Sequence, residues 1–167
     1  MPETKRIVIS GGPATGKTSI INALRERGYR CLPEFSREII RSEMAAGTDV
    51  LPWDNLTAFT EKVIAGRMEQ YHAAQPGLQF YDRSVVDSLA YMHLDKLSVQ
   101  QKWEQFLNDN RYYQTVFITE TWKDIFLTDG ERKESWEKLL HLHEYIVSTY
   151  QDWGYEICFV PKRTIEE

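Results

Sequence analysis

Gly11-Gly12-Pro13-Ala14-Thr15-Gly16-Lys17-Thr18 is the stretch that decides the fold of this 167-residue chain. It fits the pattern G-x-x-x-x-G-K-[ST] at every fixed position, and it lies between the β-branched run Ile7-Val8-Ile9 and a helical pattern from Thr18 to Arg27. Glycines let successive backbone N–H groups converge on phosphate oxygens, and the N-terminus of the following helix adds free amides and the positive end of its dipole. We therefore predict a phosphate-binding loop here.

The loop positions have distinct expected roles in holding ATP together with Mg²⁺. Lys17 is expected to reach the β- and γ-phosphates, and the Thr18 hydroxyl is expected to ligate the metal. The further nucleotide-binding residues predicted around them are Gly11, Gly12, Pro13, Ala14, Thr15, Gly16 and Ser19. The sequence contains no Asn/Thr-Lys-x-Asp guanine signature, which favours ATP over GTP.

The rest of the chain alternates short apolar runs with helical patterns. Strands are predicted at 7–9, 29–33, 78–81, 115–118 and 157–160, and helices at 18–27, 36–46, 56–72, 85–93, 99–107 and 131–153, with Ser98 as a helix N-cap. This alternation predicts an α/β fold: a P-loop NTPase three-layer sandwich in which helices flank a five-stranded parallel sheet. Residues 1–167 are expected to form a single domain.

Composition narrows the class of partner. The chain has 25 acidic and 20 basic residues and a net charge of -5, which argues against nucleic acid as a partner. No apolar stretch approaches the roughly 20 residues that a bilayer span needs, so we expect a cytoplasmic protein without a membrane partner.

Cys31 and Cys158 lack Cys-x-x-Cys spacing and are expected to be buried, reduced thiols. The five tryptophans are assigned to core and lid packing rather than to a base-binding platform.

A second candidate group follows the third predicted strand. Leu78-Gln79-Phe80-Tyr81-Asp82 is an apolar run that ends in a carboxylate. The carboxyl end of such a strand faces the phosphate loop in a doubly wound sheet, so Asp82 is the predicted acid on the magnesium side. An ordinary surface pair between Asp82 and Arg83 is the alternative.

Three segments give the chain a family resemblance. Asp82-Arg83-Ser84 resembles the Asp/Glu-Arg-Ser element of nucleoside and thymidylate kinases, and with Asp87 and Tyr91 it is similar to the P-loop ATPase family that includes the ribosylnicotinamide kinase domain of NadR. The run 33–38 resembles the Glu-x-x-Arg element of that family, and the run 129–132 resembles its lid. The resemblance covers nearly the whole chain, and it implies the kinase-like strand order 2-3-1-4-5 and a lid-like segment at about 119–134.

The resemblance also suggests acceptor residues. Glu34, after the second strand, would be the general base that takes a proton from an attacking hydroxyl, with a capping role for the helix near Ser36 as the alternative. Arg37 and Arg83 would hold a polar or anionic acceptor, with Asp87 as a further substrate residue. The alternative for the two arginines is a structural ion pair with Glu38 or Asp87.

Two basic residues complete the predicted site. Arg132 would stabilise charge on the transferred phosphoryl group as a lid residue, with Lys133 in reserve, unless 129–134 is only a solvated charge run. Arg163, after the fifth strand, is the predicted contact to the base of the nucleotide.

Together these patterns predict a magnesium-dependent kinase. It would transfer the γ-phosphoryl group of ATP to a small hydroxyl-bearing acceptor, a nucleoside or nucleoside-like metabolite. The alternative is a regulatory ATPase or switch module, in which nucleotide occupancy orders the 119–134 segment and creates a surface for a partner. The oligomeric state is left open.

Overall fold

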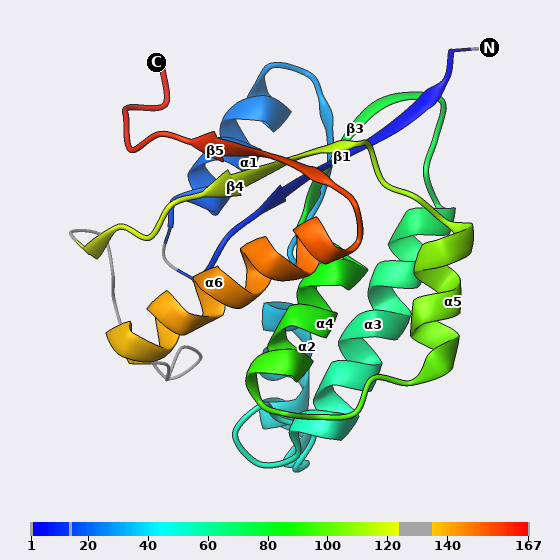
Figure 1. The fold of residues 1–167 in the computed structure, drawn as a ribbon, viewed down its shortest axis with the longest axis vertical. Helices are drawn as coiled ribbons and strands as arrows, with labels where there is room; N and C mark the ends of the chain where they lie inside the picture. The colour runs from blue at the N-terminus through cyan, green and yellow to red at the C-terminus, as the bar shows by residue number, and fades with distance from the viewer. Residues whose placement is uncertain (1, 14, 124–134, 167) are drawn as a thin grey trace.

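The computed structural model describes residues 2–13, 15–123 and 135–166, and Figure 1 shows their arrangement. The elements in chain order are β1 (Thr4–Ser10), α1 (Lys17–Glu26), β2 (Arg30–Leu32), α2 (Ser36–Ala46), α3 (Leu56–His72), β3 (Gly77–Asp82), α4 (Val85–Leu94), α5 (Gln101–Asp109), β4 (Thr115–Thr119), α6 (Trp136–Asp152) and β5 (Glu156–Val160).

The five strands form one parallel sheet in the order β2-β3-β1-β4-β5, which confirms the predicted fold class and strand order. Ile9 of β1 pairs with Asp82 on one side and with Phe117 on the other. Leu32, the last residue of β2, pairs with Tyr81. The carboxyl ends of neighbouring strands therefore meet at one edge of the sheet, where the segments that follow them lie together.

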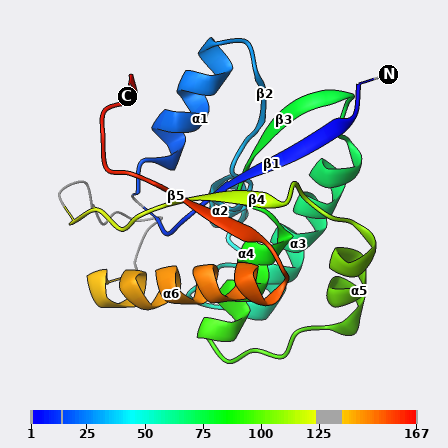
Figure 2. The ribbon, with the colours of Figure 1, turned by 45° about the horizontal axis from the view of Figure 1, so that its top comes forward.

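Helices cover the two faces of the sheet unequally. Figures 1 and 2 show α1 on one face and α3, α4, α5 and α6 on the other. The main core lies under the second group, where Ile64, Leu89 and Leu142 from three different helices are almost completely buried. A second apolar cluster joins α2 to α3 through residues such as Ile40 and Val63. Each crossover helix thus buries the apolar face that its 3.6-residue period predicts.

Two helix starts differ from the sequence predictions. The last helix begins at Trp136 rather than 131, because the Ser135 side chain accepts a hydrogen bond from the backbone N–H of Lys138 and caps it. Residues 131–134 lie outside the described part of the chain. Helix α5 is capped at Gln100 and begins at Gln101, so Ser98 is not its N-cap.

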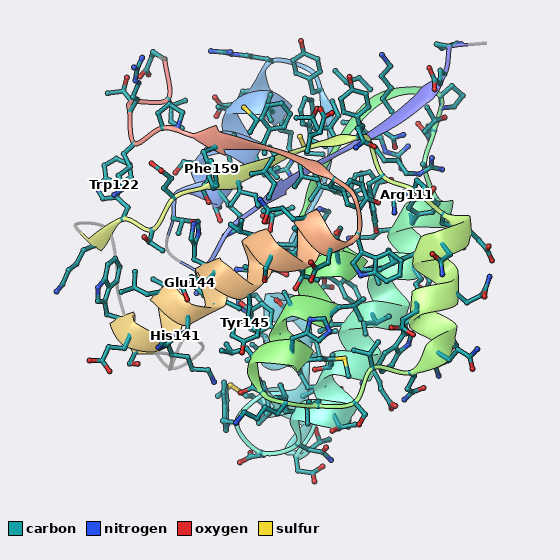
Figure 3. All side chains as sticks on the ribbon, viewed as in Figure 1. Arg111, Trp122, His141, Glu144, Tyr145 and Phe159 are labelled. Carbon is teal, nitrogen blue, oxygen red and sulfur yellow. The ribbon has the colours of Figure 1, made fainter. Side chains whose placement is uncertain are left out.

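The prediction that both cysteines are buried is wrong. Cys158 is exposed and Cys31 is half-buried, and both thiols are free. For Cys158 the reason lies in the sheet: β5 is an edge strand, and α1 packs over β2 and β3 at the other edge. Cys31 lies on the opposite edge strand, β2, and α1 covers it only partly. Phe159, labelled in Figure 3, lies next to Cys158 and is 48% exposed.

No helix among the described residues is long and apolar enough to cross a membrane. Charged and polar side chains lie on the exposed side of these helices. On α6, for example, His141 and Glu144 are both exposed, with Nδ1 and Oε2 3.8 Å apart (Figure 3).

Candidate functional site

The predicted phosphate loop connects β1 to α1 at the carboxyl edge of the sheet. Gly16 adopts a left-handed conformation at φ 87°, directly before the first residue of α1, and Gly11 has φ 133°. Residues with a side chain rarely adopt either backbone conformation, which explains why glycine occupies both positions. The first amides of α1 therefore point toward the loop, as an anion site requires. Ala14 lies outside the described residues.

Lys17 extends inside this loop. Its Nζ donates a hydrogen bond of 2.6 Å to the Gly12 carbonyl and lies 3.4 Å from Thr15 Oγ1. Burial, and next the positive charge of Arg83, lower the pKa of Lys17 to about 7. Thr18 and Ser19 follow on the exposed first turn of α1 and line the same cavity. Within the described residues the loop lysine has no ion pair with a carboxylate, which suits the binding of a polyphosphate.

Glu34 comes to this edge because β2 ends two residues before it. One oxygen, Oε1, accepts hydrogen bonds from the backbone N–H and the hydroxyl of Ser36, at 2.9 and 2.7 Å, and from Arg67 Nη2 at 3.3 Å. Burial raises the pKa of Glu34, but Arg83, Arg67 and the Ser36 bonds outweigh it and hold the pKa at about 2. The predicted alternative, contact with the start of α2, is thus present, and the same carboxylate also lines the cavity.

Asp82 ends β3 beside the loop, and its side chain is 6% exposed. Its Oδ1 has no hydrogen-bond partner among the described residues. Burial raises the pKa of Asp82, and the nearby Lys17 charge opposes the rise. A buried carboxylate oxygen without a partner, in one cavity with the Thr18 hydroxyl, provides the oxygen ligands that a magnesium ion prefers.

Arg83 takes an uncommon backbone conformation, with φ 70°. Its Nη1 donates to the Tyr91 hydroxyl at 2.7 Å, and its Nε lies 3.8 Å from Glu34 Oε2 without forming a hydrogen bond. The structure therefore pairs Arg83 with Glu34 and Tyr91, not with Asp87 as the alternative supposed. Arg37, the other predicted acceptor residue, also lines the cavity.

Asp87 is not among the residues that line the cavity, and its role as a substrate residue stays a prediction. The side chain is completely buried and accepts hydrogen bonds from the Ser10 hydroxyl, the Ser84 N–H and the Tyr150 hydroxyl. It forms a capping box with Ser84 at the start of α4. The pattern Ser84-Val85-Val86-Asp87 is the signature of such a cap, and it was the signal in the sequence for this structural role.

The cavity has a volume of about 640 Å³ and extends from the phosphate loop past Glu34 to α2, α3 and α4. Its far half is mostly apolar and aromatic. Sequence reasoning did not assign these lining residues to the site: Ile40, Trp53, Phe59, Thr60, Val63, Arg67 and Ser88. The prediction that tryptophans serve only core and lid packing is therefore incomplete for Trp53.

Arg67 is the most informative of the missed residues. It is 4% exposed, and its Nη1 donates to the Ser84 carbonyl at 3.1 Å and to Ser88 Oγ at 2.7 Å, while Nη2 reaches Glu34. One guanidinium thus joins the segment after β2 to the segment after β3. The signal in the sequence was an arginine one turn after Val63 on the same face of the helix as Phe59 and Val63, and long-range packing decides what such a residue contacts.

The remaining predicted residues are not brought into the cavity by the described structure. Asp129, Arg132 and Lys133 lie outside the described residues. Arg163 lies on the exposed segment after β5 and does not line the cavity.

Comparison with known proteins agrees with this geometry. A family model described as an AAA domain matches residues 6–167. The chain belongs to this AAA domain family. A search of the curated proteins found no match. The strand order of the sheet is also that of the P-loop fold.

Solved structures share the fold of this AAA domain at low sequence identity. A deoxyadenosine kinase from M. mycoides with bound dCMP and dCDP is 17% identical, with a TM-score of 0.68 over 96% of this chain and 92% of that chain. The NadR protein in complex with NR is 20% identical, with a TM-score of 0.69 over 95% of this chain, which spans 46% of NadR. A thymidylate kinase from Ehrlichia chaffeensis is 16% identical, with a TM-score of 0.62 over 98% and 89% of the two chains.

Proposed function

We propose that this AAA domain is a magnesium-dependent kinase that transfers the γ-phosphoryl group of ATP to a hydroxyl of a small, nucleoside-like metabolite. The observation that carries the proposal is the single cavity that joins the phosphate loop and Lys17 to the Glu34 carboxylate and continues into an apolar, aromatic half. A hydrolytic ATPase needs only the first half of such a cavity. An acceptor with a flat apolar body and a hydroxyl would fill both.

The near half of the cavity supplies the phosphate chemistry. Lys17 and the loop amides would hold the β- and γ-phosphates, and Thr18 and Asp82 would hold Mg²⁺ directly or through water. When bound, the metal would neutralise charge on the phosphate oxygens. Arg132, predicted from the sequence as a lid residue, would add a positive charge to the transferred group.

Glu34 would orient the acceptor hydroxyl and take its proton. The hydroxyl oxygen forms a bond to the γ-phosphorus, the bond from that phosphorus to the β–γ bridging oxygen breaks, and the hydroxyl proton passes to the carboxylate. With a pKa of about 2, Glu34 is a weak base. Proton transfer is therefore expected late, once the new O–P bond has made the hydroxyl acidic. Arg83 and Arg37 would hold the polar part of the acceptor.

The test is Glu34→Gln, assayed against a panel of nucleosides and vitamin-like alcohols by ADP release and by transfer of labelled phosphate. We expect transfer to fall by about 100-fold or more, because a positioned base contributes on that scale. The affinity for ATP, measured calorimetrically, should change far less than transfer, since among the described residues Glu34 acts on the loop lysine through its charge and not through a hydrogen bond. Glu38→Gln is the matched control, because Glu38 is an exposed carboxylate on the first turn of α2.

Two outcomes would overturn the proposal. Full transfer activity in Glu34→Gln would remove the assigned base. Firm ATP binding without transfer to any acceptor of the panel would instead favour the regulatory ATPase.

A further inference from the structure

Thr119, the last residue of β4, lies against the phosphate loop although it is far from the loop in sequence. Its side chain is 2% exposed, and its hydroxyl donates to the Ser10 carbonyl at 3.1 Å. The same oxygen lies 2.6 Å from Thr15 Oγ1, in the middle of the loop. A Cβ atom at Gly11 would overlap the Thr119 hydroxyl. One hydroxyl therefore touches the start and the middle of the loop.

Thr15 extends this contact to the Gly12 carbonyl. That carbonyl lies 2.8 Å from Thr15 Oγ1 and 2.6 Å from Lys17 Nζ. The two threonine hydroxyls have one proton each, and two arrangements satisfy them. In the first, the Thr119 hydroxyl donates to the Ser10 carbonyl and the Thr15 hydroxyl donates to the Thr119 oxygen. The Lys17 ammonium group is then the donor to the Gly12 carbonyl. In the second, Thr119 turns its proton from the Ser10 carbonyl to Thr15, and Thr15 donates to the Gly12 carbonyl.

The choice between these arrangements depends on where Lys17 is. When its ammonium group turns from the Gly12 carbonyl toward a phosphate, the buried carbonyl loses its donor, and leaving it unpaired would cost binding energy. The Thr15 hydroxyl lies at hydrogen-bond distance from the same carbonyl and can then be its donor, and a hydrogen bond from Thr119 to the Thr15 oxygen would hold the Thr15 hydroxyl in that orientation. Among the described residues, Thr119 is the hydroxyl placed to do so.

We propose that Thr119 is a positioning residue for the phosphate loop: it supports Thr15 so that Lys17 can leave the Gly12 carbonyl and bind the triphosphate. This inference rests on the proposed function only in that the loop binds a nucleoside triphosphate. It assigns β4 a part in nucleotide affinity but no contact with the acceptor.

The experiment measures the Kd of Mg·ATP calorimetrically for Thr119→Val and Thr119→Ser. Valine keeps the shape and removes the hydroxyl, so we expect a Kd raised about tenfold, the effect of one lost hydrogen bond to a buried group. Serine keeps the hydroxyl and should restore the affinity to within about twofold. Thr115→Val, at the opposite end of β4, is the matched control and should bind like wild type.

A purely structural role would give a different result. Unchanged ATP affinity in Thr119→Val, or equal loss in Thr119→Ser, would overturn the inference. So would a lower melting temperature with unaltered Kd. Lys17→Ala separates this result from the proposed function: if Lys17→Ala abolishes ATP binding while Thr119→Val does not weaken it, only the inference fails. If neither variant affects binding, the nucleotide site itself is wrong.

Discussion

The hydroxyl of Tyr150 donates a hydrogen bond to Oδ2 of Asp87, and both side chains are completely buried. This contact ties α6 to the N-terminus of α4, the two helices that share the largest interface between helices in the described chain. Asp87 Oδ1 also accepts from Ser10, the residue directly before the phosphate loop. A single carboxylate thus connects three segments that build the site, without facing the cavity.

Tyr150→Phe should destabilise the fold by about 1–3 kcal/mol, because it removes a donor from a buried carboxylate. Burial, followed by the Asp87 charge, raises the pKa of Tyr150 well above its usual value, so the hydroxyl stays protonated and the loss should not vary across neutral pH. Urea unfolding gives the measurement. Tyr145→Phe on the exposed side of the same helix is the control (Figure 3), and equal midpoints for the two variants would contradict the prediction.

ATP binding should take up protons at alkaline pH. In the free protein the pKa of Lys17 is lowered to about 7, chiefly by burial, and a bound triphosphate would raise it. The contribution of the charged lysine to affinity is therefore complete below pH 7. It declines as pH rises from 7 toward the pKa of the complex, by at most about tenfold per pH unit.

Calorimetry at pH 8 in buffers of different ionisation enthalpy measures this uptake directly. The matched variant is Lys17→Arg, whose guanidinium stays charged and should bind without proton uptake. Absence of uptake in the wild type would show that Lys17 is already charged in the free protein.

Gly66→Ala should displace a side chain next to the Glu34 carboxylate. A methyl group at Gly66 on α3 would overlap the ring of Phe35, the residue that follows Glu34. Alanine gains about 1 kcal/mol of helix propensity, but overpacking costs about 1–3 kcal/mol and displaces the ring. We expect lower stability and weaker phosphoryl transfer, with ATP affinity unchanged.

A double-mutant cycle with Phe35→Leu checks this mechanism for Gly66→Ala. The smaller side chain should relieve the overlap, so the two effects on stability should not add. Strict additivity would place the cause elsewhere.

Arg67→Lys should reduce turnover by about 10- to 100-fold, with little change in ATP affinity. A lysine keeps the charge but cannot bind Glu34, the Ser84 carbonyl and Ser88 together, so Glu34 would lose its fixed position. Steady-state kinetics with saturating acceptor give the measurement. Arg41→Lys, at an exposed position of α2, is the control, and an equal kcat in the two variants would remove Arg67 from the positioning of Glu34.

Local patterns in the sequence were enough for the phosphate loop and for the positions of the strands and helices. The phosphate-loop motif consists of consecutive residues between one strand and one helix. Its phosphate-binding role can therefore be predicted from residue spacing alone. The carboxylate at the end of the third strand was likewise predicted to face the phosphate loop, because the carboxyl ends of parallel strands share one edge. The first residues of the helices were predicted less accurately, because a single capping side chain such as that of Ser135 decides where a helix begins.

Contacts between distant segments decided the rest. Asp87 and Arg67 are both charged residues on helices, yet packing turns the first to a buried tyrosine and the second to the cavity. A local capping pattern accounts for Asp87 at the start of α4, but the contacts of Arg67 depend on which distant partners satisfy its buried charge. The same holds for Thr119, which reaches the phosphate loop only because β4 pairs with β1. The amino-acid sequence by itself predicted a phosphate-binding loop and its place between a strand and a helix, because both depend on consecutive residues. The tertiary structure decided which residues surround that loop, because they come from distant segments.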